Sequence, residues 1–521
     1  MAFSVANSAY NAMSLIGQFI TSPLTISVVA FSLVILLFEE IRSWYRLKHI
    51  PGPFSMAISK FPMARMAATG KQSIHLRELG DKYGPLFRVG PNEVLYGDIS
   101  TFRMITAPRS PFYKPKWYEG TRFTETDNVV SLSNEEDHKI RRAKLAAGYA
   151  GKEGVGFEDG TNKHINSFIN LIESKYISTP TDYRPMELAH KLMYLAIDVI
   201  TELGFGQALG FLANDKDMHN YIEINDHVLP KTFFLYEFPL VQQLLKMWPF
   251  YKLAPSSKDG FGFGALMGLM TSIIDNRLKP DAEHGHDMLA SELRNGLTRD
   301  EVLAEAFVKI IAGTDSSAMA IRMSVLYLLT NPTAFSSLRQ EIDAQIAAGK
   351  ISSPVNNNEA NALPYLQAVI RETMRMYPPI ANRNWKLVPK GGVTLHGYFI
   401  PEGTMVGVNL LYIMRNKEVF GVDADVWRPE RWIEAAAEDE KLGGSGGRLR
   451  DMLNSVDACF SHGKYSCLGK SLALVEINKV LVELVRRYDF TIADPLTPFT
   501  MFEAGLFTAN DFWVRITRRQ S

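Results

Sequence analysis

The sequence predicts a mainly α-helical body with small β-sheets, an α+β protein. Apolar residues recur with a helical period over most of the chain. Two segments instead have the pattern of strands: 84–96, with a turn at Gly90-Pro-Asn92, and 393–408. Because the first lies near the start of the body and the second near its end, we expect both ends to contribute to the sheets.

The composition excludes several classes of protein. Lysine plus arginine and aspartate plus glutamate number 56 each, so nothing indicates the basic face of a nucleic-acid-binding protein. The 521 residues exceed the roughly 250–300 at which most chains divide, so length alone favours two or three domains. Cys459 and Cys467 are the only cysteines, which excludes a disulfide framework and indicates a reducing compartment.

The N-terminal segment predicts a membrane anchor. No charged residue precedes Glu39, and the uncharged stretch 13–38 ends in the apolar block 26–38. Because a helix needs about 20 mostly apolar residues to cross a bilayer, we expect a transmembrane helix here. A cleaved signal peptide is one alternative, but its positively charged start is missing. A buried core helix is the other.

The residues after this stretch predict its orientation and its end. Basic residues follow it, which by the positive-inside rule leaves the rest of the chain in the cytosol; they are Arg42, Arg46 and Lys48. The segment Ile50-Pro-Gly-Pro53 cannot continue a helix. We therefore expect residues 1–50 to form an anchor and linker, and residues 51–521 to form the globular body.

The strongest chemical signal is a cysteine just before a helical pattern. Cys467 precedes the segment 471–485, so its thiol would lie at a helix N-terminus, where the dipole and free amides favour a thiolate. Gly463 and Gly469 allow the backbone to turn tightly beside it. A lone cysteine in such a place is more often an inert core residue, so the residues around it must indicate whether Cys467 has a function.

That pattern is Phe460, two residues, Gly463, three residues, Cys467, one residue and Gly469. It resembles the haem-binding loop of the cytochromes P450, in which a cysteine thiolate ligates the iron. The resemblance implies that Cys467 is the axial ligand of haem b and that Phe460 packs beside it. It covers nearly everything after Pro51, and therefore implies one haem-thiolate catalytic domain over 51–521 despite the length.

One position departs from the family pattern. Two residues before the cysteine the family usually has arginine or histidine, which pairs with a haem propionate, whereas this chain has Tyr465. A phenol donates a hydrogen bond but carries no charge at neutral pH. His138 and Arg142 have the i, i+4 spacing at which the family usually has tryptophan and arginine. By resemblance, Arg142, His138 and Arg383 are expected to hold the propionates, although an ordinary basic surface helix gives the same pattern.

A second motif has a structural meaning in the family. Glu372 and Arg375 have the i, i+3 spacing that puts both side chains on one helix face, which any surface helix could offer. In the family this pair joins an arginine from a later loop, and Pro429-Glu-Arg431-Trp432 supplies it. The resemblance implies that Glu372, Arg375 and Arg431 form a buried network that holds the fold.

A third motif lies in the middle of a long predicted helix. Thr298 to Glu301 has the pattern of a capping box, and Asn331-Pro332 would end the helix after about Leu329. Its middle, Ala312-Gly-Thr-Asp-Ser-Ser317, is polar and weakly helical between apolar flanks. In the family this segment crosses the distal haem face, so Ala312 and Gly313 are expected to face the haem. Asp315 is expected as the catalytic acid, and Ser316 takes the place of the usual threonine hydroxyl.

The resemblance also implies a substrate pocket and electron-transfer partners. By family position, the expected substrate contacts are Phe307, Ile311, Ile380, Leu506 and Phe507, which favour a lipophilic small molecule. The chain has no dinucleotide-binding fingerprint, so NADPH-cytochrome P450 reductase is the expected electron donor, with cytochrome b5 as a further candidate. The expected location is the endoplasmic reticulum membrane, crossed once, with the catalytic domain on the cytosolic side.

The sequences of the haem loop and of the C-terminus are similar to those of fungal secondary-metabolism enzymes, including pisatin-demethylase-like and abscisic-acid-pathway monooxygenases. We expect insertion of one oxygen atom from O₂ into a terpenoid or polyketide, with detoxifying O-demethylation as the alternative. An isomerase or dehydratase that uses the same scaffold without O₂ is a further alternative. Asp315 with Ser316 argues against that alternative. A non-catalytic haem-binding protein is the last alternative, and it would need no weak segment in the long helix.

Overall fold

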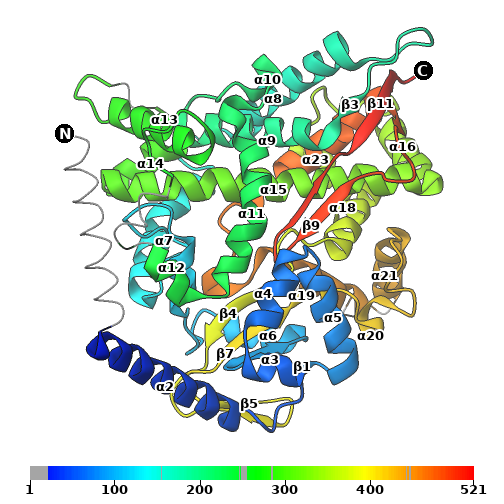
Figure 1. Ribbon diagram of the computed structural model, residues 1–521. Coiled ribbons are helices and arrows are strands. Elements are labelled where there is room, and N and C mark those ends of the chain that lie inside the picture. Colours follow the sequence, from blue (N-terminus) through cyan, green and yellow to red (C-terminus); the bar gives the residue numbers. More distant parts are fainter. Residues whose placement is uncertain are drawn as a thin grey trace.

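The computed structural model describes residues 22–153, 155–245, 247, 255–282, 285–441, 443–444 and 447–520. A large helical part packs around one long helix, and a smaller part is built on a four-stranded sheet (Figure 1). The fold is therefore mainly helical with small sheets, as the sequence predicts.

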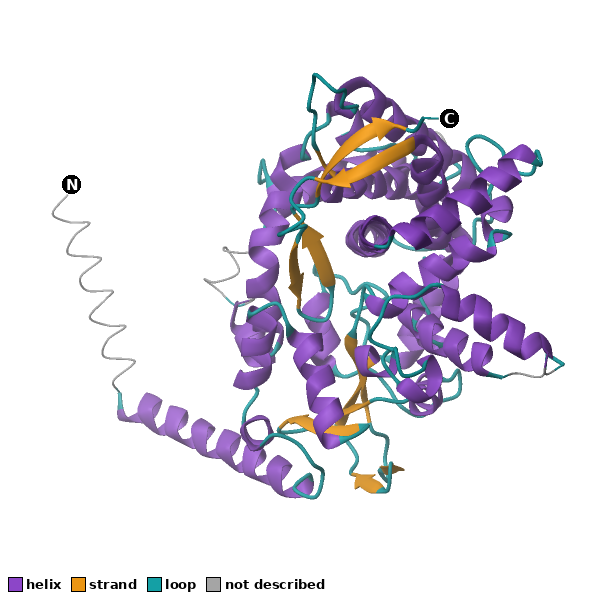
Figure 2. Cartoon of the chain, turned by 90° about the vertical axis from the view of Figure 1, so that its right-hand side faces the viewer, coloured by secondary structure: helices purple, strands orange, loops and turns teal. Residues whose placement is uncertain are grey.

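The long helix α15 (Arg299–Thr330) runs through the middle of the helical part and is viewed nearly along its axis in Figure 2. The predicted capping box is confirmed: the Glu301 N–H donates to Thr298 Oγ1 at 3.4 Å, and the Thr298 N–H donates to Glu301 Oε2 at 2.8 Å. The helix is continuous through Gly313. A Cβ there would lie 3.1 Å from Ile200 Cγ1, so glycine allows close packing against α9 (Leu188–Phe205).

Helices from all parts of the sequence surround α15, and α9 and α23 (Lys470–Arg487) pack directly against it. The remaining α-helices are α3 (Phe54–Ile58), α4 (Phe61–Ala68), α5 (Gln72–Tyr83), α6 (Ile99–Thr106), α7 (Glu135–Tyr149), α8 (Phe157–Leu171), α10 (Phe211–Asn214), α11 (Tyr221–Tyr236), α12 (Pro239–Leu245), α13 (Gly262–Arg277), α14 (Met288–Arg294), α16 (Pro332–Ala347), α17 (Asn357–Asn361), α18 (Pro364–Met376), α19 (Leu410–Ile413), α20 (Lys417–Phe420), α21 (Glu430–Lys441) and α22 (Arg448–Asp457). Short 3-10 or π helices are η1 (Lys116–Thr121), η2 (Ile172–Tyr176), η3 (Met218–Asn220), η5 (Ala458–Phe460) and η6 (Gly463–Tyr465).

The main sheet joins the two predicted β segments. The hairpin of β1 (Leu86–Gly90) and β2 (Glu93–Tyr96) is confirmed, and β2 pairs in parallel with β7 (Met405–Asn409). The order is β1-β2-β7-β4, with β4 (Asn382–Leu387) antiparallel to β7. Smaller sheets use β3 (Met186–Glu187), β5 (Val393–Leu395), β6 (Tyr398–Ile400), β8 (Tyr488–Ile492), β9 (Thr500–Glu503), β10 (Phe507–Asn510) and β11 (Trp513–Arg518).

The N-terminal helix α2 (Pro23–Arg46) projects from the body beside the main sheet (Figure 1). The predicted transmembrane stretch 13–38 lies partly outside the described residues, because the description begins at residue 22. Within the described part of the chain, no helix has the length and apolar character needed to cross a membrane. The predicted anchor is therefore not seen in the structure.

Candidate functional site

The cysteine loop has the tight geometry that its glycines predict. The Cys467 N–H donates to Phe460 O at 2.6 Å, which closes the loop just before α23. Gly463 has φ = +58°, and a Cβ there would lie 2.2 Å from Thr106 O, so only glycine fits. Cys467 is exposed, whereas Cys459 is half-buried. The loop therefore presents one accessible sulfur at the start of a helix.

The electrostatic balance at this sulfur differs from the simple prediction of a favoured thiolate. Although the residue as a whole is exposed, the surrounding loop desolvates the sulfur in part, and this desolvation raises the pKa of the Cys467 thiol. The N–H groups of Gly469 and Lys470 and the nearby Arg142 guanidinium act in the opposite direction and offset part of this rise. A cation bound at the sulfur would complete the stabilisation of the thiolate, which is the chemistry that a haem iron supplies.

The middle of α15 presents an acid and a hydroxyl on neighbouring residues. Asp315 is 4% exposed, and burial raises its pKa to about 6, with Asp226 adding to the rise and Arg322 opposing it. Ser316 Oγ donates to Ala312 O at 2.6 Å, and Ala312 is exposed although the flanking turns of the helix are mostly buried. Ala312 and Ser316 therefore share an open face of the helix, while Asp315 points into the protein.

A direct contact fixes α15 relative to the helix that follows the cysteine. Ser317 on α15 hydrogen-bonds the side chain of Glu476 on α23, a fully buried acid whose pKa burial raises to about 8. Glu476 comes nine residues after Cys467 and lies within the first two turns of α23. Because α23 packs directly against α15, this hydrogen bond fixes the helix that follows Cys467 against the middle of α15.

A cluster of cations surrounds Tyr465. Lys386 Nζ lies 4.2 Å and Lys114 Nζ 5.9 Å from the centre of the Tyr465 ring, and both lysines are buried. Arg142 Nη2 donates to Ser466 Oγ at 2.8 Å, which places the predicted arginine at the cysteine loop. We call Lys114, Lys386 and Arg142 the cation cradle. Sequence reasoning missed both lysines.

In the cation cradle, burial disfavours the charged forms of the two lysines. The Tyr465 hydroxyl donates to Glu135 Oε1 at 2.6 Å, and this carboxylate also pairs with Lys464 at 2.9 Å. Burial lowers the pKa of Lys386 far below its usual range, and the Lys114 charge adds to this effect. Burial likewise lowers the pKa of Lys114 to about 7. Two buried lysines beside the cysteine loop fit a haem, because its propionates would favour the charged forms that burial alone disfavours.

Two of the residues predicted to hold the propionates, His138 and Arg383, depart from that prediction. His138 is uncharged, and Arg383 pairs with another residue. His138 is buried with its ring centre 5.5 Å from that of Tyr465, and burial lowers its pKa to about 3, so it is a neutral ring at physiological pH. Arg383 ion-pairs with Glu237 and donates to Ala504 O at 2.6 Å. The predicted role of Arg383 at the propionates stays a prediction, since its guanidinium is directed to Glu237.

The predicted structural network comes together in the interior. Arg375 donates to both oxygens of Glu372 at 2.8 and 2.9 Å, and Arg431 Nε donates to the same carboxylate at 3.0 Å. All three side chains are fully buried. Burial alone would raise the pKa of Glu372, but the hydrogen bonds and charges of the two arginines outweigh it and lower the pKa.

The predicted substrate residues fall into two groups. Ile380 and Leu506 pair across an isolated β-bridge, and Ile380 is 55% exposed, so this pair offers an apolar surface. Ile311 is half-exposed one residue before Ala312. Phe307 and Phe507 are buried in aromatic packing, Phe307 against Phe263 and Phe507 against Tyr377. They therefore support the neighbouring residues and do not themselves present an exposed surface to a substrate.

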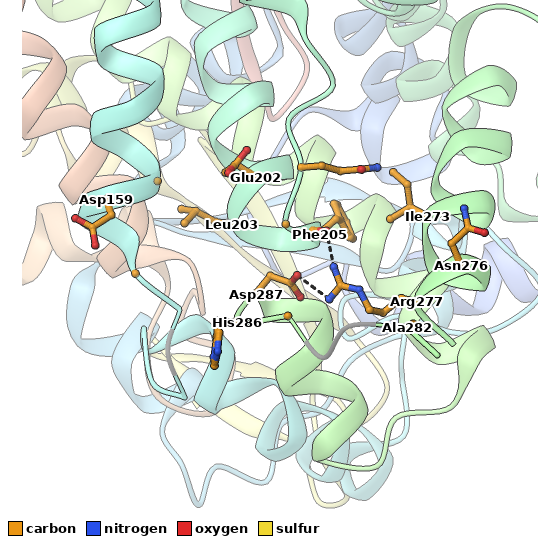
Figure 3. Close-up of a pocket in the computed structure, with 15 residues that line it drawn as sticks. Asp159, Glu202, Leu203, Phe205, Ile273, Asn276, Arg277, Ala282, His286 and Asp287 are labelled. Carbon is orange, nitrogen blue, oxygen red and sulfur yellow. Dashed lines mark hydrogen bonds and ion pairs between the residues drawn. The ribbon is translucent and has the colours of Figure 1, made fainter. Parts of the chain in front are cut away.

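A separate polar pocket of about 650 Å³ opens between α8, α9, α13 and α14 (Figure 3). Arg277 lies at its wall, where it donates to Asp287 at 2.8 Å and to Phe205 O at 3.1 Å. None of the predicted site residues lines this pocket. It is therefore distinct from the site around Cys467.

Comparisons with known proteins agree with this geometry. The family model described as "Cytochrome P450" matches residues 51–510. "Cytochrome P450 monooxygenase aba1" of Botryotinia fuckeliana is 35% identical over 479 residues, which are 91% of this chain and 92% of that protein. "Cytochrome P450 monooxygenase cicH" of Emericella nidulans is 30% identical over 505 residues, 94% and 97% of the two chains.

A solved structure supports the fold independently. The "Crystal structure of cytochrome P450DA heme domain" superposes with a TM-score of 0.71, covering 90% of this chain and 98% of that chain. Its sequence identity is 15%, so the likeness concerns the fold. The resemblance drawn from the sequence motifs is confirmed, and so is the mainly helical fold with small sheets, while the N-terminal transmembrane helix stays a prediction.

Proposed function

Because the chain belongs to the cytochrome P450 family, we propose that it inserts one oxygen atom from O₂ into a C–H bond of a lipophilic small molecule. Two electrons from NADPH, delivered by a separate reductase, and two protons reduce the second oxygen atom to water. Haem b bound through Cys467 supplies the centre at which dioxygen is activated. The protein's own residues hold that group, deliver protons and exclude competing chemistry.

The observation that carries the proposal is the acid beside a hydroxyl on the open face of α15. Because burial raises the pKa of Asp315 to about 6, its carboxyl group can both gain and lose a proton near neutral pH. Ser316 is the next residue, and its Oγ lies on the open face with Ala312. We assign to Asp315 the supply of protons and to Ser316 their transfer into the pocket.

The remaining predicted residues have supporting roles in this proposal. Arg142, with Phe460, Gly463, Tyr465 and Gly469 of the cysteine loop, holds the haem from the Cys467 side. Ala312, on the open face of α15, would approach the haem, whereas Gly313 packs against Ile200 of α9. Glu372, Arg375 and Arg431 hold the surrounding fold.

For the substrate we propose a terpenoid or polyketide of fungal secondary metabolism. The exposed Ile380 and the half-buried Leu506 beside it favour a lipophilic molecule, and similar chains carry the names aba1 and cicH in fungi. O-demethylation of a toxic compound is the alternative. The two differ in their product, since demethylation releases formaldehyde and hydroxylation does not.

We also propose that the N-terminal residues anchor the enzyme in the endoplasmic reticulum membrane, with the body over 51–521 in the cytosol. The uncharged stretch 13–38 followed by basic residues supports this arrangement. The anchor predicts that the full chain resists extraction by alkaline carbonate while a chain lacking residues 1–50 does not. Carbonate release of both forms alike would contradict it.

Oxygen-isotope labelling tests the proposed reaction. The full chain is combined with a fungal P450 reductase, NADPH, ¹⁸O₂ and a panel of terpenoids and polyketides chosen by substrate-induced spectral shifts. We expect a product that carries one ¹⁸O atom and forms only with NADPH. A product that forms without NADPH or without ¹⁸O would instead identify an isomerase or dehydratase on this fold.

A further inference from the structure

Behind Asp315, a buried arginine lies on the same helix. Arg322 follows Asp315 by seven residues, two helical turns, so both point to one side of α15. Arg322 is 1% exposed, and its Nη1 donates to Ala509 O on β10. Its Nε and Nη2 have no hydrogen-bond partner among the residues that the structure describes. The charges of Asp315 and Arg322 interact, since each shifts the pKa of the other.

A second polar group reaches the surface near Arg322, whose charge interacts with those of Asp226 and Glu187. His190 on α9 lies between two carboxylates, with Nε2 3.8 Å from Asp226 Oδ2 and Nδ1 3.6 Å from Glu187 Oε2. Asn510 Nδ2 donates to the same Asp226 oxygen at 2.8 Å. The side chains of His190 and Asp226 are 35% and 23% exposed, so this group contacts solvent.

Several buried polar atoms between these two groups lack partners in the described part of the chain. They are Arg322 Nε and Nη2 and Asn510 Oδ1. Buried polar atoms in folded proteins are nearly always hydrogen-bonded, and where side chains do not reach, ordered water does so. These three atoms, from α15 and β10, indicate where ordered water would connect the surface group with the interior.

We infer that the protons consumed in oxygen activation enter at His190 and Asp226, pass along ordered water held by Arg322, and reach Asp315. This inference rests on the proposed function, because only a reaction that consumes protons needs such a route. Arg322 does not relay protons itself, since a guanidinium stays protonated in proteins. It is a positioning residue that orients water, while His190 and Asp226 exchange protons with solvent. Each turnover moves two protons inward, and both leave in the water formed from the second oxygen atom.

The charges around the route set its pH response. Asp315 is faced by Arg322 from its own helix and by Asp226 from α11. Burial lowers the pKa of His190, but Asp226 and Glu187 outweigh it and raise the pKa above its usual value. Replacing Asp226 by asparagine removes a negative charge that faces both groups. The pKa values of Asp315 and His190 should therefore both fall in that variant.

The test compares Asp226→Asn with Glu223→Gln in the full-length holoenzyme. Glu223 is exposed on the same helix one turn earlier, so its variant makes the same charge change outside the route. For Asp226→Asn we expect the fraction of NADPH recovered as product to fall on the order of tenfold, with a larger solvent deuterium isotope effect on coupling. Glu223→Gln should match the wild type in both, and His190→Gln should follow Asp226→Asn.

A second readout needs no turnover. The carboxyl stretch of protonated Asp315, identified by its loss in Asp315→Asn, is titrated by infrared spectroscopy in the resting enzyme. Its midpoint should be lower in Asp226→Asn than in the wild type and unchanged in Glu223→Gln. Unchanged coupling, isotope effect and midpoint in Asp226→Asn would overturn the route. If the wild type consumed no O₂ at all, the proposed function would fail, and with it the route, while the infrared midpoint would still report the link between Asp226 and Asp315.

Discussion

Two clusters of buried charge in this protein differ in how completely the chain neutralises them. In the structural network, Glu372 accepts from Arg375 and Arg431, and the remaining arginine N–H groups reach main-chain carbonyls such as Met414 O at 2.7 Å. In the cation cradle, Lys114 and Lys386 donate mainly to neutral oxygens, with Lys114 Nζ 2.9 Å from Val129 O. The charged groups of the first cluster are paired with one another, whereas the two lysines of the second donate mainly to uncharged oxygens.

The difference separates a cluster that holds the fold from one that binds a ligand. Burying an ion is unfavourable unless an opposite charge and hydrogen bonds compensate it. The pKa of Glu372 is lowered, so its ionised form is favoured in the fold, whereas the pKa values of Lys114 and Lys386 are lowered, so their charged forms are disfavoured. Substitutions in the two clusters should therefore change stability in opposite directions.

The largest change in the free energy of unfolding is expected from Glu372→Gln. It leaves Arg375 and Arg431 buried without their carboxylate, which typically costs about 3–5 kcal/mol in the free energy of unfolding. Urea denaturation and the yield of folded, haem-containing protein measure this loss. Asp275→Asn is the control, because its exposed pair with Arg299 should contribute at most about 1 kcal/mol. Equal stability of the two variants would show that the network is not structural.

Replacing Asp315, a buried acid whose charge Arg322 offsets only in part, should instead increase the free energy of unfolding. The pKa of Asp315 is raised from about 3.9 in the unfolded chain to about 6 in the fold. The folded state thus binds the proton more tightly, and ionised Asp315 destabilises the fold above pH 6. Asp315→Asn should add about 2–3 kcal/mol to the free energy of unfolding at pH 7.5, at about 1.36 kcal/mol per pKa unit.

This gain should shrink as the pH falls through 6 and disappear below about pH 4, where Asp315 is protonated in both states. Urea denaturation at several pH values measures the trend. The same variant should lose coupled turnover, since it cannot release a proton. A stability gain that is independent of pH would contradict the raised pKa.

A smaller effect is expected from Lys386→Met. One charge-assisted hydrogen bond to a propionate is worth about 1.5–3 kcal/mol, so haem affinity should fall about tenfold to 150-fold. Without haem the variant should be at least as stable as the wild type, because methionine replaces an amine whose charged form the fold disfavours. Haem transfer to apomyoglobin and urea denaturation of the haem-free protein measure the two quantities. Lys390→Met, an exposed lysine on the same segment, should change neither.

The parts of the site that lie within one element were predictable. The capping box fixed the start of α15 at Thr298, and the glycines at 463 and 469 predicted the tight loop around Cys467. Such features depend on residues a few positions apart, whose local geometry is set by the backbone. The positions of the two strand patterns, one near each end of the globular body, likewise indicated that both ends contribute to the sheets.

The cation cradle was not predictable, because its members come from distant segments. Lys114 lies in the loop before η1, and Lys386 lies in β4 beyond a register irregularity. Arg383 has φ = +76° at that irregularity, and its side chain is directed to Glu237 rather than to Tyr465. A bulge changes the face to which the following side chains point, and the sequence carries no clear sign of it.

The carbon monoxide difference spectrum of the reduced full-length protein tests the central claim most directly. If Cys467 binds the haem iron as a thiolate, the spectrum should show a strongly red-shifted Soret band that is lost in Cys467→Ala. Cys459→Ala, which removes the other cysteine, should keep the band. A band typical of histidine or neutral thiol ligation in freshly prepared folded protein, or a shifted band that survives in Cys467→Ala, would contradict the assignment and the monooxygenase mechanism built on it.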